Sequence, residues 1–118
     1  MKFLFLVRSA QAGPPPPALI EAMGKLAERE IKAGRLLDTG GLMPPAAGAE
    51  VRINSGKIGV TDGPFIEAKE VIGGYAVFEL PGKDAALASA KEFMQLHLDL
   101  FPGWEGTCEV RAFAPAGP

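Results

Sequence analysis

The chain has 118 residues but only one cysteine, Cys108, and one histidine, His97. A single cysteine cannot form a disulfide within the chain, so the fold does not depend on an oxidising compartment. A zinc site would have to be built mostly from carboxylates, and we therefore predict no bound metal. Cys108 alternates with Val110 in a strand-like segment, which is typical of a small buried hydrophobe. The alternative, a reactive thiol, would need a neighbouring group that lowers its pKa.

Long apolar runs and basic clusters are also missing. No stretch approaches the roughly 18 apolar residues that a membrane-spanning helix requires. The apolar run at residues 3–7 is too short for a signal peptide and ends at Arg8. The net charge is -2, without the basic surface that nucleic acids or anionic membranes would require. We therefore expect a cytoplasmic protein that binds neither nucleic acids nor membranes.

The glycine-rich and nucleophile motifs of common enzymes are absent as well. The sequence has no G-x-x-x-x-G-K-[ST] loop, no G-x-G-x-x-G fingerprint, no G-x-S-x-G turn and no C-x-x-C pair. We accordingly predict no cofactor. Proton transfer or hydrolysis would suit the polar groups that are present better than redox chemistry or phosphoryl transfer.

The order of strand-like and helix-like segments predicts one α+β domain over residues 1–118. Apolar residues recur at intervals of three and four along two segments, 18–33 and 83–97, as in amphipathic helices. Alternating or continuous apolar patterns predict strands at 2–8, 35–39, 50–54, 57–61, 72–80 and 107–113. This order is typical of an α+β sandwich, an antiparallel sheet with two helices on one face.

The first predicted strand is apolar on both faces. Phe3, Phe5 and Val7 point one way, and Leu4 and Leu6 point the other way. Two helices cover only one face of such a sheet, and the other face would leave a large apolar patch in water. The simplest way to bury that patch is a second copy packed face to face, so we expect a two-fold homodimer.

The most informative segment is residues 61–70, Thr-Asp-Gly-Pro-Phe-Ile-Glu-Ala-Lys-Glu. Asp62 suits a tight turn because its side chain can accept a hydrogen bond from its own downstream backbone. Gly63 can adopt backbone angles that other residues resist, and Pro64 fixes its own φ. This turn, together with Phe65, would form one wall of a ligand cleft.

Charged residues follow the turn at Glu67, Lys69 and Glu70. A lysine between carboxylates can keep one of them ionised while another moves a proton. Asp62 would then be a polar anchor or general base, with the other three binding the ligand. The alternative is that Asp62 only closes the turn and that the other three form a solvated ion cluster.

Three further polar side chains are candidates for the same site. His97 falls on the apolar stripe of the second predicted helix, as a proton shuttle or as a satisfied core or capping histidine. Arg8 ends the first strand, where it would bind a carboxylate or phosphate, or simply lie on the surface. Tyr75 would direct its hydroxyl into a cavity between two copies, or only pack there.

Several motifs resemble the YCII-related superfamily, and within it the branch named for the DGPF motif. The matching residues include Asp62-Gly63-Pro64-Phe65, Glu67-x-Lys69-Glu70, Ile72-x-Gly74-Tyr75 and the late run from Pro102 to Arg111. The resemblance implies a ferredoxin-like fold that dimerises into an α/β barrel. A wider YCII-like relative is thought to use a His–Asp pair, whereas His97 lies late in this chain.

The resemblance supplies no activity, because the DGPF branch is largely uncharacterised. We expect a small organic ligand in a cleft near the DGPF loop, with acid–base chemistry by Asp62. The alternative is a non-catalytic regulatory or interaction module, because relatives are often found beside or fused to alternative sigma factors.

Overall fold

The computed structural model describes residues 1–10, 13–63 and 70–115. The predicted helices and strands are confirmed, with small changes at their ends, and the second helix continues past His97. In chain order the elements are β1 (Lys2–Ser9), α1 (Pro17–Lys32), β2 (Leu36–Gly41), η1 (Pro45–Ala47), β3 (Ala49–Asn54), β4 (Lys57–Asp62), β5 (Val71–Glu79), α2 (Lys83–Leu100) and β6 (Gly106–Ala112). Among these residues, no helix is long and apolar enough to cross a membrane.

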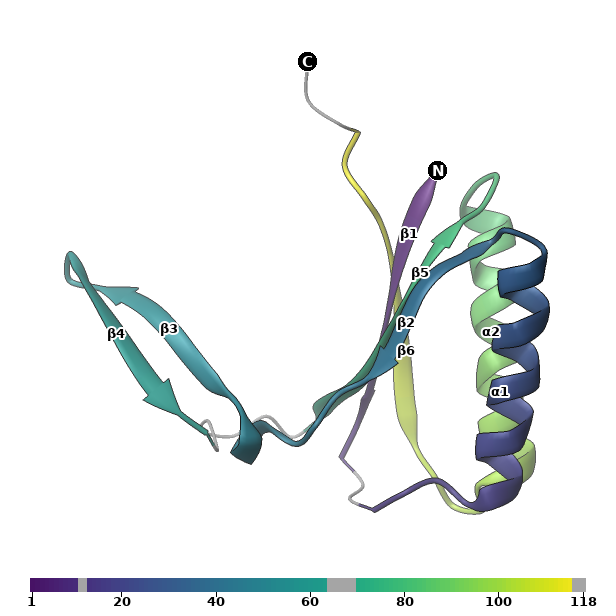
Figure 1. The fold of residues 1–118 in the computed structure, drawn as a ribbon, viewed down its shortest axis with the longest axis horizontal. Helices are drawn as coiled ribbons and strands as arrows, with labels where there is room; N and C mark the ends of the chain where they lie inside the picture. The colour runs from purple at the N-terminus through teal and green to yellow at the C-terminus, as the bar shows by residue number, and fades with distance from the viewer. Residues whose placement is uncertain (11–12, 64–69, 116–118) are drawn as a thin grey trace.

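Four strands form an antiparallel sheet in the order β2-β5-β1-β6. Strand β1 pairs with both β5 and β6, which explains why its sequence is the most apolar. Both helices lie on one side of the sheet, and the other side carries no helix (Figure 1). This α+β arrangement is compatible with a ferredoxin-like fold.

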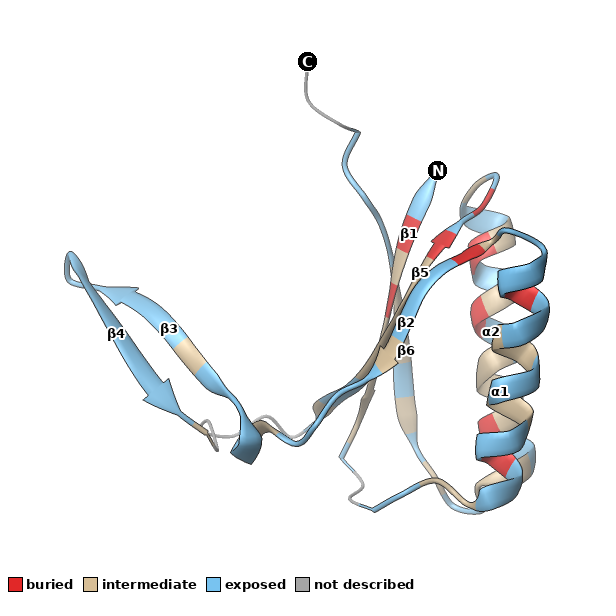
Figure 2. Ribbon diagram, in the orientation of Figure 1, coloured by how far each residue is buried: buried red, intermediate tan, exposed pale blue. Residues whose placement is uncertain are grey.

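The core lies between the sheet and the two helices (Figure 2). Phe3 and Phe5 of β1 are buried there, and the ring of Phe5 lies 4.7 Å from that of Phe78 on the neighbouring strand. Ala86 and Ala90 of α2 let that helix approach the rings closely. The alternate residues of β1 point to the helix-free face and are only half-buried.

The end of α1 is fixed by a hydrogen-bonded cap. Gly34 has a φ of 75°, a conformation that favours glycine, and its N–H donates to the carbonyl of Ile31 at 3.0 Å. The N–H of Arg35 donates to the carbonyl of Glu30, also at 3.0 Å. These two bonds satisfy carbonyls that the helix end would otherwise leave open and turn the chain directly into β2.

Strands β3 and β4 form a separate hairpin that extends away from the body, on the side opposite the helices (Figure 1). Its two-residue turn consists of Ser55 and Gly56, with φ values of 52° and 74°. Positive φ at both central positions is the requirement of a type I′ turn, whose twist matches that of the strands. The hairpin is therefore a defined element, although no other strand in the described part of the chain pairs with it.

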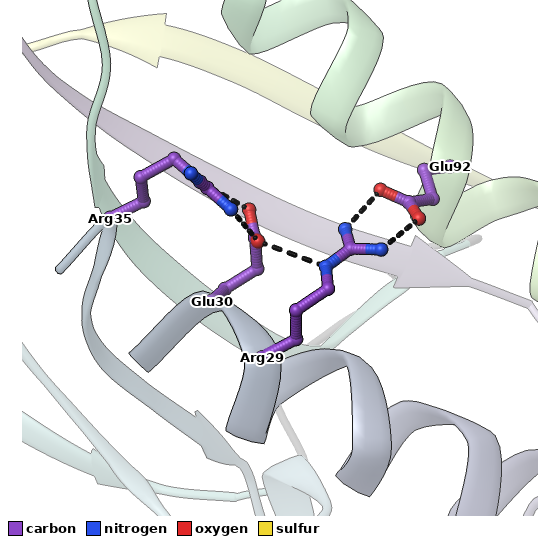
Figure 3. A network of polar contacts seen from close by, with 4 residues as sticks. All are labelled: Arg29, Glu30, Arg35 and Glu92. Carbon is purple, nitrogen blue, oxygen red and sulfur yellow. Dashed lines mark hydrogen bonds and ion pairs between the residues drawn. The ribbon is translucent and has the colours of Figure 1, made fainter. Parts of the chain in front are cut away.

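A polar network ties α1 to both β2 and α2 (Figure 3). Glu30 is only 5% exposed and accepts hydrogen bonds from Arg35 at 3.0 and 2.5 Å and from Arg29 at 3.2 Å. Arg29 also holds both carboxylate oxygens of Glu92 on α2, at 2.8 and 2.6 Å. Hydrogen bonds from the Arg35 guanidinium, followed by those from Arg29, lower the pKa of Glu30.

We predict that Glu30→Gln lowers the free energy of unfolding by about 1–2 kcal/mol at pH 7, because charged hydrogen bonds are lost and both arginines are partly exposed. The folded pKa of Glu30 lies below its ordinary value of 4.5. Its contribution is therefore present above pH 4.5 and disappears as the pH falls through the folded value. Urea unfolding from pH 7 to pH 3 measures both effects.

The control for this prediction is Glu28→Gln on the same helix. Glu28 is 64% exposed and pairs only with Lys32, one turn along. Such pairs contribute about 0.5 kcal/mol or less. Equal losses in the two variants, or a difference between wild type and Glu30→Gln that grows on acidification, would show that the network does not stabilise the fold.

Candidate functional site

A cavity of about 690 Å³ lies between the helices and the sheet. Its walls come from the inner face of the sheet, from α1 and from α2 with the segment that follows it. Most of them are apolar and include Phe5, Met23, Leu26, Phe93, Phe101 and Trp104. A hollow of this size and lining is typical of a site for a compact organic molecule.

His97 is a polar residue among the mostly apolar side chains that line this cavity. It lies in the last turn of α2 and is only 6% exposed. Its Nδ1 lies 3.1 Å from the carbonyl oxygen of Phe93, one turn earlier. The imidazole lies between two other rings, 4.6 Å from the ring of Phe93 and 4.5 Å from that of Trp104. The ring is therefore held in one orientation by a hydrogen bond and by contacts on both sides.

The other ring nitrogen of His97 is open to the cavity. A carbonyl oxygen only accepts hydrogen bonds, so Nδ1 donates to Phe93, and Nε2 of the neutral ring carries a lone pair. Within residues 1–10, 13–63 and 70–115, Nε2 has no hydrogen-bond partner, and no side-chain nitrogen or oxygen is both fully buried and unpartnered. Nε2 is therefore not fully buried, and His97 is among the residues that line the cavity.

Trp104 is positioned by the tight connection between α2 and β6. Its backbone N–H donates to the carbonyl of Phe101 at 3.0 Å, and Gly103 has a φ of 76°. The indole lies so close to Gly106 that a Cβ there would be 2.3 Å from its Cη2 atom. Glycine at position 106 thus makes room for the ring that packs on His97. In the sequence, the run from Pro102 to Arg111 indicated only a family resemblance, and it did not indicate that Trp104 packs on His97.

Glu30 and Cys108 also line the cavity, and neither offers a reactive site. The carboxylate of Glu30 is engaged by Arg29 and Arg35, so it serves the fold. Burial raises the pKa of Cys108 to about 11, which keeps its thiol protonated near neutral pH. The interpretation of Cys108 as a small hydrophobe agrees with this position, where it packs against the core.

A second hollow, of about 500 Å³, lies at the base of the hairpin. Arg8, Glu70 and the segment between β2 and β3 line it, and it shares residues 42–45 with the first cavity. Arg8 donates a hydrogen bond to Glu109 through Nη1, and its Nε lies 3.9 Å from Oε2 of Glu70. The structure therefore brings Arg8 and Glu70 together at this hollow, but the arginine already has carboxylate partners.

Asp62 lies at the end of β4, opposite Ala49 in the hairpin, and is exposed. It is not among the residues that line either hollow, and its carboxylate has no hydrogen-bond partner within the described part of the chain. His97 and Asp62 thus do not share a cavity. Pro64, Phe65, Glu67 and Lys69 lie outside the described residues.

Gly63 is required for a reason that differs from our expectation. Its φ is not in the left-handed region. Its N–H donates to the carbonyl of Gly48 at 2.8 Å, and a Cβ there would lie 1.8 Å from the carbonyl oxygen of Pro45. Close approach of two backbone segments, and not an unusual backbone angle, excludes a side chain at this position. Gly63 therefore fixes the base of the hairpin.

Tyr75 lies on the helix-free face, where it stands opposite Leu6 in the sheet. Its hydroxyl donates to Oδ2 of Asp38 at 2.9 Å, and this hydrogen bond is the main cause that raises the pKa of Tyr75. Gly40, its neighbour on β2, has no side chain to obstruct the ring. Tyr75 is also among the residues that line the large cavity, but its hydroxyl is engaged.

No group of three or more histidine, cysteine, aspartate or glutamate side chains that could hold a metal ion occurs in the described ranges.

We predict that Gly63→Ala destabilises the base of the hairpin by about 1–3 kcal/mol, because the rigid backbone at Pro45 has to move. Hydrogen exchange at the amides of Gly63 and Gly48, compared with urea unfolding, measures this loss. The matched control is Gly59→Ala on β4, where nothing lies within 4 Å of the added Cβ. Unchanged exchange in Gly63→Ala would contradict the close approach.

Comparison with known proteins places the fold in a family but gives no activity. The YCII-related domain matches residues 1–97, which include β1, both hairpin strands and α2 as far as His97. The chain is also similar to an uncharacterised protein of Rhizobium meliloti (strain 1021). The two are 28% identical over 108 residues, which cover 92% of this chain and 83% of that protein. The chain therefore belongs to the YCII-related domain family.

Proposed function

We propose that this YCII-like protein binds a compact, mainly apolar organic molecule in the cavity between the helices and the sheet, with His97 as its acid–base group. The observation that carries the proposal is the open Nε2 of a buried, rigidly held imidazole in an aromatic wall. A ring that is already oriented loses little entropy when a ligand binds. The aromatic walls contribute affinity, and the single nitrogen contributes orientation.

The chemistry that suits this arrangement is proton transfer. Nε2 of the neutral ring accepts a proton from a bound molecule, or from a water that attacks it, while Nδ1 keeps its hydrogen bond to Phe93. Cys108 does not compete as a nucleophile near neutral pH, because burial keeps its thiol protonated. Proton transfer or hydrolysis is thus the reaction class that we assign to the site.

The second hollow, at the base of the hairpin, is the part of this proposal that involves the DGPF segment. Gly63 packs against Pro45, and Glu70 lines this hollow, so the two ends of that segment flank it. We assign the chain to the DGPF branch on this basis and on its sequence motif. Asp62 is then a neighbour of the ligand site, and not its anchor.

A second candidate is a non-catalytic interaction module, for example one that works with a sigma factor. The observation that favours it is the exposed apolar face of the hairpin, with Val51, Ile53, Ile58 and Val60. A protein that only binds a small molecule has no need of such a face.

We also propose that two copies pack through their helix-free sheet faces as a dimeric α/β barrel. Leu4, Leu6 and Val77 form the half-buried apolar centre of this face. Arg8 and Glu109 lie beside them, so the face carries both signs of charge. Because Arg8 and Glu109 are already paired within one copy, a partner surface could cover them without leaving either charge alone.

The test is a thermal-shift screen of a metabolite library with wild type, His97→Asn and Asp62→Asn. The asparagine amide can replace the Nδ1–H donor of His97 but not the lone pair of Nε2. We expect hits whose stabilisation disappears in His97→Asn and persists in Asp62→Asn. At a ligand concentration 100 times the dissociation constant, binding contributes about 2.7 kcal/mol, which a thermal shift detects easily.

The opposite result decides against this site. Hits that persist in His97→Asn and disappear in Asp62→Asn would move the ligand to the exposed turn. A His97→Asn variant that loses its hits must also keep the wild-type melting temperature without ligand, since a collapsed cavity would bind nothing.

A further inference from the structure

We propose that the β3–β4 hairpin is an arm that holds a second copy of this chain, with its apolar face buried against that copy. The inference rests on the face-to-face dimer proposed above and adds the element that clasps it. We call the apolar surface formed by Val51, Ile53, Ile58 and Val60 the arm face.

The two faces of the hairpin differ sharply in chemistry. Val51 stands opposite Val60, and Ile53 stands opposite Ile58, so the four side chains lie on one face. Each of them is 68% to 76% exposed. The other face carries polar and charged residues, namely Glu50, Arg52, Asn54, Lys57 and Thr61. Such alternation is the pattern of a strand pair with one buried face, yet nothing within the described chain covers the arm face.

The hairpin is also too small to be stable without a partner surface. An isolated two-stranded hairpin is marginal in water, and β-branched residues stabilise a sheet mainly by packing. Its internal geometry is nevertheless well defined. The type I′ turn at Ser55 and Gly56 sets the register, and the close approach of Gly63 to Pro45 holds the base. A hairpin with an uncovered apolar face is suited to bind a surface beyond its own body.

A second copy is the occupant that the geometry favours. The arm extends from the side of the sheet that carries no helix (Figure 1). That same side presents the half-buried Leu4, Leu6 and Val77. When two such faces meet around a two-fold axis, each arm passes beside the partner's body, and every contact is made twice.

The size of the interface supports the same choice. A stable dimer buries about 800 Å² on each partner. The sheet face has an apolar centre of a few side chains with charged neighbours, whereas the arm face adds four exposed β-branched residues. The two surfaces together therefore offer more apolar side chains to a second copy than the sheet face offers alone.

The test is sedimentation equilibrium on wild type and three variants. Ile53→Glu/Ile58→Glu places two charges on the arm face, and Leu6→Glu places one at the centre of the sheet face. Arg52→Gln/Lys57→Gln changes the opposite face of the hairpin and alters the net charge by the same amount as the double glutamate variant. We expect the first two to raise the dimer dissociation constant at least about 100-fold, and the control to change it less than about threefold.

The outcomes separate this inference from the dimer on which it rests. A wild type that stays monomeric at high concentration overturns both. A dimer that Leu6→Glu dissociates and Ile53→Glu/Ile58→Glu leaves intact overturns the arm alone. If the arm variant binds no second copy because it fails to fold, its circular dichroism will show that failure, and a second measurement then decides.

The second measurement changes a single residue of the arm face and adds no charged side chain there. In a Cys108→Ser background, an environment-sensitive dye on Ile58→Cys reports on the arm face, and the same dye on Lys57→Cys reports on the polar face. We expect the emission at position 58 to shift to the blue as the concentration rises through the dissociation constant, and that at position 57 to stay constant. A dye at position 58 that remains in water in the dimer overturns the proposal.

Discussion

The structure depends on a central strand that is apolar on both of its faces. Phe3 and Phe5 of β1 fill the space under the two helices, whereas Leu4 and Leu6 point to a side that has no helix. The helix-covered side gives the core and the cavity. We propose that the helix-free side, together with the arm, is covered by a second copy.

On the helix-covered side, the sheet and helices do not close completely. The gap is lined with aromatic rings, and His97 is held between two of them with its Nε2 open. The same helix that buries Ala86 and Ala90 in the core with Phe5 therefore carries His97, the proposed acid–base group, in its last turn. Elsewhere on this side, the ion pairs of Arg29, Glu30, Arg35 and Glu92 link α1 to α2 and to the start of β2 (Figure 3).

The sequence was sufficient to predict the helices and strands and their order, because the signals for them come from residues close together in the chain. Examples are the spacing of apolar residues, Pro17 at the start of α1 and Gly34 after its end. It was less informative about the site, where distant segments meet. Asp62 stood out because of its neighbours in sequence, yet it lies outside both hollows. Trp104 gave no local signal for its contact with His97, and Gly63 is needed because Pro45, far along the chain, approaches it. Glu30 could have been noticed, since a carboxylate on the apolar stripe of a helix needs cations such as Arg29 and Arg35.

The central claim is that the helix-free face is buried in solution. Hydroxyl-radical footprinting of the wild-type protein at high concentration measures it directly, because the rate of side-chain oxidation follows accessibility. Leu98, which is 74% exposed on α2, provides the internal reference. The account predicts that Leu4 and Leu6 are oxidised far more slowly than Leu98 and that dilution reduces this protection. Oxidation of Leu4 and Leu6 at a rate that does not change with concentration would contradict it.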